Sequence, residues 1–259
     1  MQKLSAVVIT LNEEKHIERC LGSLVSAVDE ILVLDSGSTD KTLEIAQRFL
    51  NVKIYQVKWL GYADTKNLGN SLASYDWIIS VDADESLSAD LVNSILEWKQ
   101  MEASHNSGFN RANYFNGIWI KNAGWYPDFK WRIFNRNTTK WIGTIHEQLK
   151  GNSIETNSPI LLKGDCLHFS YSSVDELRQQ SIKFAKLGAF SLFERKRFMS
   201  WFKIFTSPLF RFFKSFVLQR GFLDGRVGFW IAWYSAYESF VKYNELRKLI
   251  FYKKDKFLL

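Results

Sequence analysis

The 259-residue chain contains only two cysteines and three prolines, and it lacks any long apolar run. Cys20 and Cys166 are far apart and have neither metal-ligand nor redox spacing, so the sequence indicates neither a disulfide framework nor a zinc site. This use of cysteine fits a reducing cytosol. A bilayer span needs about 20 uninterrupted apolar residues, whereas the best candidate, 227–241, is short and contains Glu238. We therefore expect a protein that is not integral to a membrane.

Several short motifs are also missing at the start of the chain. Residues 1–9 are apolar only briefly before Thr10, which is too short for a signal peptide, so export is not expected. Neither a Gly-x-Gly-x-x-Gly turn nor a Gly-Lys-Ser/Thr loop follows the first apolar run, which argues against a dehydrogenase and a P-loop enzyme. A nucleotidyltransferase would need a glycine-rich basic loop there, which residues 10–13 do not provide.

The first hundred residues alternate short β-rich runs with helical patterns, which is typical of a parallel sheet flanked by helices. Strands are expected at 6–10, 31–35, 52–57 and 77–81. Helical spacing of apolar residues follows at 17–28 and 43–49, and further helices are expected around 66–72 and 89–99. The predicted fold class is therefore α/β, with a mostly parallel, Rossmann-like sheet.

The texture of the sequence changes twice along the chain. Short aromatic strands and loops are expected at 108–168, and helices dominate after Val174, with breaks at Pro208 and at 221–228. We predict a catalytic domain at 1–172 and a C-terminal amphipathic helical region at 173–259. Within the first, 1–100 would bind the donor substrate of a group-transfer reaction, and 101–172 would bind the acceptor substrate.

Polar residues follow the predicted strands at the edge where parallel α/β sheets bind ligands. The first strand ends in Thr10-Leu-Asn12-Glu13, the second in Asp35-Ser-Gly-Ser-Thr-Asp40, and the fourth in Asp82-Ala-Asp84-Glu85. A lone Asp-x-Asp is usually a solvated turn, but here it has companions at the same edge. Carboxylates in this setting suit Mg²⁺ or Mn²⁺, which would neutralise a departing diphosphate.

Other residues in these segments suit a nucleotide diphosphate. Asp35 can accept hydrogen bonds from a base or ribose, although capping of the next helix is its ordinary reading. The Ser-Gly-Ser turn leads into a helix N-terminus that favours anions. Lys66 supplies positive charge, although a helical lysine is most often solvent-exposed.

The ordered set of these motifs, with Lys66-Asn67-x-Gly69 between them, resembles glycosyltransferase family 2 and its GT-A fold. Two later segments, Trp131-Arg132-Ile-Phe and 141–147 (WIGTIHE), resemble the bacterial lipopolysaccharide core β-glucosyltransferase branch. Residues 221–229 resemble the C-terminal helical region of that branch.

This resemblance implies roles for individual residues. Asp35 would contact uracil or ribose, Asp82 the ribose or a metal-bound water, and Asp84 the metal. The residues expected to bind the donor are Thr10, Asn12, Glu13, Asp35, Lys66, Asp82 and Arg132. A divalent cation, Mg²⁺ or Mn²⁺, is the expected cofactor.

Family 2 enzymes invert the anomeric centre, so an acceptor hydroxyl must lose its proton to a base. Glu147 is our candidate for that base. His146 and His168 are candidate metal or diphosphate ligands, although a hydrogen-bonded structural histidine explains each as well. Arg132 would hold the diphosphate or an acidic acceptor.

The net charge of +7 is concentrated in one region. Residues 178–220 hold ten Lys or Arg and one acid, Glu194, a local charge of +9 that leaves −2 elsewhere. Because aromatic residues are interleaved with this charge, we expect peripheral docking on an anionic membrane rather than an ordinary packed helix. No nucleic-acid motif accompanies the charge, and no nucleic-acid partner is expected.

These observations predict an inverting, metal-dependent glycosyltransferase at the cytoplasmic face of the bacterial inner membrane. It would move glucose from UDP-glucose onto a heptose or similar sugar of a lipid-linked lipopolysaccharide core. The alternatives are a family 2 transferase for another cell-surface glycan or a protein, and a membrane-surface module that binds nucleotide sugars without turnover.

Overall fold

The computed structural model describes residues 1–101, 105–143, 147–151, 160–195 and 201–255, with side chains described as far as Phe251. The chain forms two compact units. Unit 1 comprises Met1–Ala112 and Pro127–Phe169, and unit 2 comprises Asn113–Tyr126 and Ser170–Leu259.

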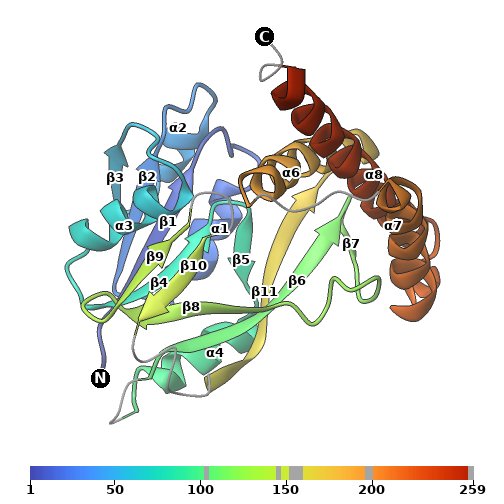
Figure 1. Cartoon of the computed structure of the whole chain (residues 1–259). Helices are drawn as coiled ribbons and strands as arrows, with labels where there is room; N and C mark the ends of the chain where they lie inside the picture. Colours follow the sequence, from blue (N-terminus) through green and yellow to red (C-terminus); the bar gives the residue numbers. More distant parts are fainter. Residues whose placement is uncertain (102–104, 144–146, 152–159, 196–200, 256–259) are drawn as a thin grey trace. The chain divides into compact units, whose positions relative to one another are not determined.

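A large mixed sheet is the centre of unit 1 (Figure 1). Its strands lie in the order β3-β2-β1-β4-β8-β6-β11-β5. The parallel part consists of β1 (Leu4–Thr10), β2 (Glu30–Asp35), β3 (Val52–Gln56) and β4 (Trp77–Asp82). The other strands are β5 (Glu85–Leu87), β6 (Ser107–Phe115), β8 (Phe129–Asn135) and β11 (Ile160–Tyr171). Antiparallel pairing joins β8 to β4 and β6, and β11 to β5.

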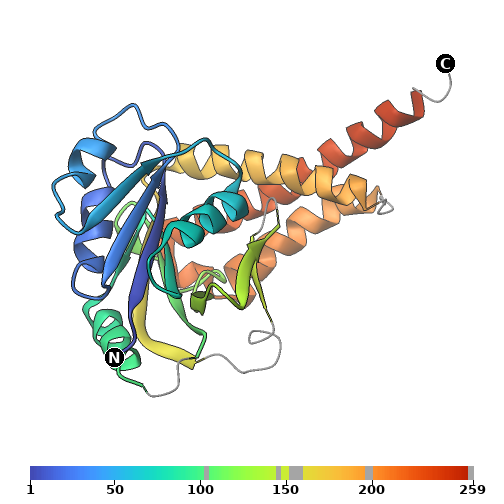
Figure 2. The same cartoon turned by 90° about the vertical axis from the view of Figure 1, so that its left-hand side faces the viewer.

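Alternating residues of β1 fill the core on both faces of the sheet. Ala6 and Val8 pack on one face with α1 (Ile17–Leu24) and α4 (Ala89–Trp98). Val7 and Ile9 pack on the other with α3 (Tyr62–Leu72) and the hairpin of β9 (Thr139–Ile142) and β10 (Gln148–Gly151). Figure 2 shows the sheet nearly edge-on between these layers. Since β1 is buried on both faces, it reads as a continuous apolar run, as central parallel strands do.

Gly69 explains how closely α3 approaches the sheet. A Cβ atom at this position would lie 2.5 Å from Val7 Cγ1 and 2.9 Å from Leu34 Cδ1. Only a residue without a side chain lets the helix sit at this depth. The short helix α2 (Thr42–Ala46) follows β2 and contributes Ala46 to the opposite core.

Unit 2 is mainly helical. Its elements are β7 (Ile118–Trp119), α6 (Val174–Glu194), α7 (Phe202–Phe213), the π-helical turn η1 (Lys214–Leu218), the 3-10 turn η2 (Gly221–Asp224) and α8 (Gly225–Asp255). Both α6 and α7 pack along α8. The Asp224 carboxylate accepts hydrogen bonds at 2.9 Å from the backbone and the side-chain nitrogen of Asn122. Residues 221–225 therefore connect the start of α8 to the 120–126 loop through these hydrogen bonds.

The sequence prediction that Pro208 breaks a helix is wrong. Pro208 lies inside α7, and the helix continues through it to Phe213. A proline removes the hydrogen bond to the carbonyl four residues earlier, here that of Ile204, and its ring crowds that carbonyl. Burial of Ile204 and packing of α7 on α8 outweigh that loss. The predicted break at 221–228 is confirmed, because Arg220 adopts a left-handed conformation there and η2 separates η1 from α8.

Candidate active site

Strand register places three of the predicted site residues side by side. In the parallel pairings Thr10 is opposite Asp35, and Ile9 is opposite Asp82. The carboxyl ends of β1, β2 and β4 therefore form one edge, at which ligands of α/β sheets bind.

Hydrogen bonds that involve side chains join the loop after β1 to the loop after β2 at this edge. Asn12, which has a positive φ of 57°, donates its backbone N–H to Ser38 Oγ at 2.9 Å and accepts from Thr39 N–H at 2.8 Å. The buried Asp35 carboxylate accepts from the backbone N–H groups of Gly37 and Ser38 at 3.1 Å. Asp35 thus shapes its own turn, and a carboxylate with two such bonds keeps lone pairs for a ligand.

Two hydroxyls at this edge are buried without a hydrogen-bond partner among the described residues. They are Thr10 Oγ1 and Ser36 Oγ, and the two residues are joined by a 3.1 Å bond from Ser36 N–H to the Thr10 carbonyl. Unsatisfied buried polar atoms are uncommon, and a binding site is one place where they are found. Ser36 is a site candidate that the sequence prediction included only as part of the Ser-Gly-Ser turn.

Lys66 is buried between two carboxylates. Its Nζ lies 2.9 Å from Asp82 Oδ1 and 3.0 Å from Glu147 Oε1, and the side chain is 1% exposed. The ammonium group also lies 4.9 Å from the centre of the Trp141 ring. The ordinary expectation of an exposed helical lysine is therefore wrong here. Lys66 joins the predicted donor residue Asp82 to the predicted base Glu147.

Arg132 approaches Asp82 from the neighbouring strand. Its Nη2 lies 3.3 Å from Asp82 Oδ2 and 2.7 Å from Glu85 Oε1, and Glu85 also accepts from the Asp82 backbone N–H at 3.0 Å. Arg111 Nη1 contacts the same Glu85 oxygen at 3.5 Å. The fully buried Glu85 is thus a positioning residue for Arg132, a role the sequence prediction did not assign.

The charges around Asp82 decide its ionisation. Burial alone would raise its pKa, but the Lys66 ammonium and the Arg132 guanidinium hold the pKa of Asp82 well below its usual range. Burial lowers the pKa of Arg132, yet Glu85 and Asp82 outweigh it and raise that pKa. Asp82 is therefore ionised at neutral pH.

Asp84 and His168 form a second group. His168 Nε2 lies 3.1 Å from Asp84 Oδ2, and the Asp84 carbonyl accepts from the Phe169 N–H. Adjacent ligands of an octahedral ion with bonds of about 2.1 Å lie roughly 3 Å apart, so this pair fits one hard cation. Among the described residues no group of three or more His, Cys, Asp or Glu could hold a metal ion. His146, the other predicted ligand, lies outside the described residues.

The pKa of Glu13 reflects the negative charge of the carboxylates gathered at this edge. Partial burial, helped by the nearby carboxylates of Asp84 and Asp40, raises the pKa of Glu13 to about 7. His168 acts in the opposite direction. A divalent cation beside Asp84 would relieve the same repulsion, so the acidic groups present fit such an ion.

Asn67 holds the β9–β10 hairpin in place. Its side-chain Nδ2 donates to the Trp141 carbonyl at 2.9 Å, and its Oδ1 accepts from the Trp141 N–H at 3.0 Å. The amide therefore pairs with strand β9 as a neighbouring strand would. Trp141 lies against Lys66, and Glu147 precedes β10. In the Lys66-Asn67-x-Gly69 motif, Lys66 therefore supplies the buried positive charge, Asn67 holds the hairpin, and Gly69 lets α3 approach the sheet closely.

Comparison with known proteins agrees with this geometry. Residues 5–153 match the sequence profile of Glycosyl transferase family 2, and the chain belongs to that family. Its α/β sheet with flanking helices is the GT-A fold predicted from the sequence.

The chain is similar to individual bacterial proteins and to a solved structure. It is 30% identical to an uncharacterized glycosyltransferase of Rickettsia felis, over 98% of this chain and 93% of that protein. It is 28% identical to the lipopolysaccharide core biosynthesis glycosyltransferase LpsC of Rhizobium meliloti, over 80% of this chain and 78% of LpsC. A crystal structure of S. aureus TarS with UDP-GlcNAc is similar with a TM-score of 0.49 and 18% identity, over 70% of this chain and 66% of that one.

Proposed function

We propose that this family 2 glycosyltransferase transfers a hexose, namely glucose from UDP-glucose, onto a heptose or similar sugar of a lipopolysaccharide core, with inversion. The observation that carries the proposal is that Lys66 forms ion pairs with both Asp82 and Glu147 at the carboxyl edge of the sheet. It brings a candidate donor-binding carboxylate and a candidate base to the same buried cation.

The donor would lie along the edge formed by β1, β2 and β4. The Thr10 and Ser36 hydroxyls, which lack partners among the described residues, are available to its polar groups, and Asp35 retains acceptor capacity for a base or ribose. Asn12 would keep the two loops closed around the nucleotide.

Asp84 and His168 would hold Mg²⁺ or Mn²⁺, with His146 as a further candidate. The ion, when bound, supplies positive charge to the departing diphosphate. Asp82 remains an ionised acceptor beside it because Lys66 and Arg132 stabilise its charge. Glu85 keeps Arg132 in contact with Asp82.

Glu147 would take the proton from the acceptor hydroxyl. The bond from the anomeric carbon to the diphosphate oxygen breaks, and a new bond forms from that carbon to the acceptor oxygen on the opposite face. The acceptor proton moves to the Glu147 carboxylate, and the nucleoside diphosphate leaves with the bonding electrons. Lys66 Nζ, which lies 3.0 Å from Glu147 Oε1, positions Glu147 for this step. The hydrogen bond from Asn67 to the Trp141 carbonyl holds the hairpin next to Glu147 in place.

The acceptor class is supported by a relative. LpsC is named for lipopolysaccharide core biosynthesis, and its similarity extends over four-fifths of this chain. The resemblance of residues 131–134 and 141–147 to the core glucosyltransferase branch points to the same acceptor.

The proposal is tested by transfer from UDP-glucose to a lipopolysaccharide core acceptor, with wild type and Glu147→Gln compared. The variant should bind UDP with an affinity within about threefold of wild type, by calorimetry, and lose at least 100-fold in transfer rate. Proton NMR of the wild-type product should show the inverted, β configuration.

Different failures have different meanings. Wild type that binds UDP-glucose without turnover would favour the nucleotide-sugar-binding module. Transfer that survives Glu147→Gln would remove Glu147 as the base, and an α-linked product would contradict inversion.

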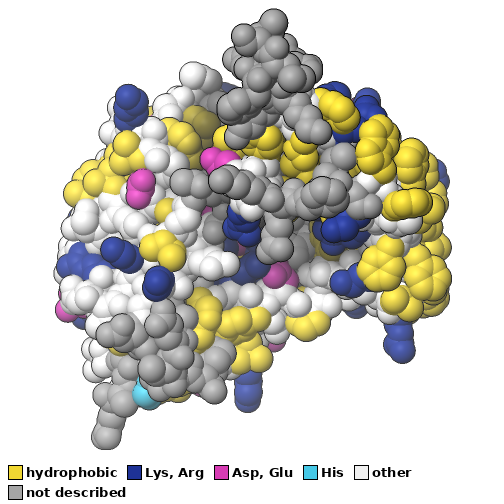
Figure 3. Space-filling view, in the orientation of Figure 1, with side chains coloured by type: hydrophobic (Ala, Val, Ile, Leu, Met, Phe, Trp, Pro, Cys, Tyr) yellow, Lys and Arg dark blue, Asp and Glu magenta, His cyan; other side chains and the backbone are white. Residues whose placement is uncertain are grey.

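The surface of α7 and η1 supports a peripheral membrane location. Its apolar members are exposed, with Phe202 at 78% and Leu209 at 73%. Lys203, Arg211 and Lys214 are exposed among them. We call this set the α7 surface; its other exposed apolar residues are Phe205, Phe210, Phe213, Val217 and Leu218. Figure 3 shows hydrophobic side chains gathered over α7 at the right-hand margin.

The α7 surface would dock on the anionic cytoplasmic face of the bacterial inner membrane. Contiguous exposed apolar groups mark interaction surfaces, and each basic residue near an anionic leaflet adds about 1 kcal/mol. The described helices include none long and apolar enough to cross a membrane. Docking at the surface is therefore what we propose for this region.

Vesicle flotation tests this docking. Wild type should bind vesicles containing phosphatidylglycerol, and Arg211→Gln with Lys214→Gln should weaken binding by roughly 30-fold, about 1 kcal/mol for each charge. The matched control replaces two exposed lysines of unit 1, Lys15→Gln with Lys163→Gln, and should leave binding within about twofold. Equal losses in both double variants would show a general charge effect and contradict the α7 surface.

A further inference from the structure

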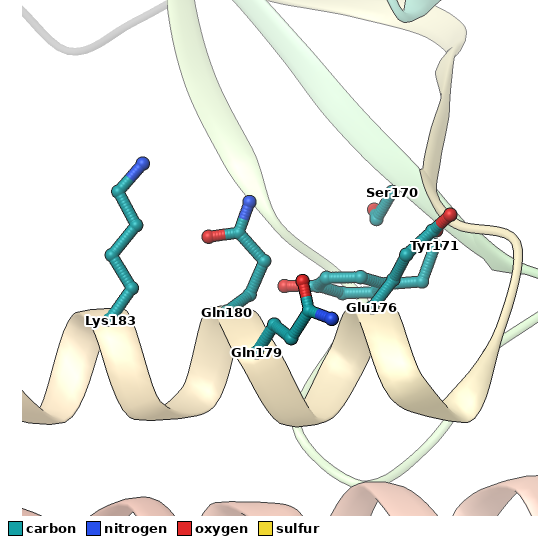
Figure 4. Close-up of a pocket in the computed structure, with 6 residues that line it drawn as sticks. All are labelled: Ser170, Tyr171, Glu176, Gln179, Gln180 and Lys183. Carbon is teal, nitrogen blue, oxygen red and sulfur yellow. The ribbon is translucent and has the colours of Figure 1, made fainter.

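A separate pocket lies wholly within unit 2, at the end of β11 and the start of α6. It has a volume of about 420 Å³ and is lined by Ser170, Tyr171, Glu176, Gln179, Gln180 and Lys183. Figure 4 shows Gln180 and Lys183 pointing to the same side of α6, with the Tyr171 ring lying across the start of the helix. This volume is within the roughly 300–1,000 Å³ range of small-molecule sites.

The pocket is rigid at one end. The Glu176 carboxylate accepts from the Ser172 N–H at 2.7 Å and the Ser172 hydroxyl at 2.6 Å, and Ser173 Oγ caps the Glu176 N–H at 3.2 Å. The Tyr171 ring packs against Trp125, with ring centres 5.9 Å apart. These contacts fix the helix start and the ring before any ligand binds.

The other end offers groups that the described residues do not satisfy. Gln180 Oε1 is buried and has no hydrogen-bond partner among the described residues. None of the ion pairs found in the described part of the chain involves Lys183, and the Glu176 carboxylate, which also lines the pocket, accepts two hydrogen bonds from Ser172. A buried amide oxygen requires a donor, and an unneutralised ammonium favours an anion.

The ligand that suits these groups is polar on most sides and apolar on one. Five of the six lining side chains end in polar groups other than a ring, which favours a ligand with several hydrogen-bonding groups. A sugar ring presents hydroxyl donors to Gln180 and Gln179 and a C–H face to Tyr171. Lys183 adds a preference for a phosphate substituent on that sugar.

We infer that this pocket is a subsite for an anionic saccharide, namely a phosphorylated sugar of the acceptor. The inference rests on the proposed glycosyl transfer and deepens it, because it names the charge class of the acceptor. It assigns Gln180 and Lys183 as specificity-determining residues.

The test uses the full-length protein and two probes, the phosphorylated lipopolysaccharide core oligosaccharide and the same oligosaccharide after enzymatic dephosphorylation. Calorimetry measures binding without any donor, and transfer assays then give KM for acceptor and donor separately. Wild type should bind the phosphorylated probe about fivefold more tightly, a modest factor because Lys183 is solvent-exposed.

Two variants and one matched control separate the contributions. Lys183→Met should weaken binding of the phosphorylated probe about fivefold and leave the dephosphorylated probe unchanged. Lys186→Met, an exposed lysine on the same helix outside the pocket, should change neither. Gln180→Met should weaken both probes about fivefold without lowering the melting temperature, because the amide oxygen has no partner to lose among the described residues.

The outcomes are distinct from failure of the proposed function. Loss of transfer with UDP-glucose while both probes still bind as expected would refute the catalytic proposal and retain the saccharide pocket. No measurable binding of either probe, or equal effects of Lys183→Met and Lys186→Met, would overturn the pocket. An acceptor KM that moves together with the donor KM would do the same, because a saccharide subsite affects only the acceptor.

Discussion

Replacement of Lys66 by methionine tests whether a buried cation holds the site together. Methionine keeps an apolar stem of similar length beside Trp141 but removes the ammonium that contacts Asp82 and Glu147 at 2.9 and 3.0 Å. Removing one partner of a buried ion pair costs about 3–5 kcal/mol of stability. The Asp82 and Glu147 side chains keep 28% and 22% exposure, and Arg132 still faces Asp82. We therefore expect a loss of about 2–3 kcal/mol.

The assay is urea unfolding at pH 7.5 of wild type, Lys66→Met, Glu147→Gln and the double variant. Removing Glu147 charge should relieve part of the defect of Lys66→Met, so the double variant should be more stable than the sum of the single effects by about 1 kcal/mol. Additive effects, or a Lys66→Met stability within 0.5 kcal/mol of wild type, would refute the buried-cation reasoning.

The pH dependence of this defect has a definite sign. Lys66 lowers the pKa of Asp82, so the stability that Asp82 contributes is present above its ordinary pKa and is lost as the pH falls. The gap between wild type and Lys66→Met should therefore be largest near neutral pH and should shrink in acid. A gap that grows toward low pH would contradict the assigned ion pair.

Three further predictions concern the scaffold of the site. Asn67→Ala should leave UDP affinity within about threefold but lower the transfer rate at least tenfold, since the hairpin loses two hydrogen bonds to Trp141; an equal loss of UDP affinity would contradict a role limited to the hairpin. Gly69→Ala should destabilise the protein by about 1–3 kcal/mol in urea unfolding, because the new methyl would overlap Val7 and Leu34; a neutral result would show that α3 can move away. Hydrogen bonds from Lys53, Ser74 and Ser5 outweigh burial and lower the pKa of Glu30 to about 2, so about 2 kcal/mol of stability should be lost as the pH falls from about 4.5 to 2. Glu30→Gln should lack that acid-dependent loss. If the stability of Glu30→Gln depended on pH in the same way as that of wild type, the lowered pKa of Glu30 would be refuted.

The sequence predicted which strand ends meet at the carboxyl edge of the sheet, because strand ends depend on local patterns. Buried parallel strands end where their apolar runs end, so Thr10, Asp35 and Asp82 meet once the strands pair in parallel. The Asp82-Ala-Asp84 turn follows from the end of β4 in the same way. Alternation between strand and helix was enough to predict the α/β class.

Long-range side-chain pairings were beyond such patterns. Lys66 and Glu147 are separated by 81 positions, and nothing local to either residue signals that the lysine is buried. Glu85 likewise reads as the end of a turn, although it lies buried under Arg132. Pro208 was misread because local propensity was weighed without the packing of α7 on α8 that keeps the helix intact.

The most direct test of glycosyl transfer at this edge is release of nucleoside diphosphate from a panel of UDP-, GDP- and dTDP-sugars. Wild type and Asp84→Asn would be compared with Mg²⁺, with Mn²⁺ and with chelator, in the presence of a lipopolysaccharide core acceptor. We predict turnover of UDP-glucose that needs a divalent ion and falls at least 100-fold in the variant. Turnover that is unaffected by both the chelator and Asp84→Asn, or no turnover of any donor, would contradict the account.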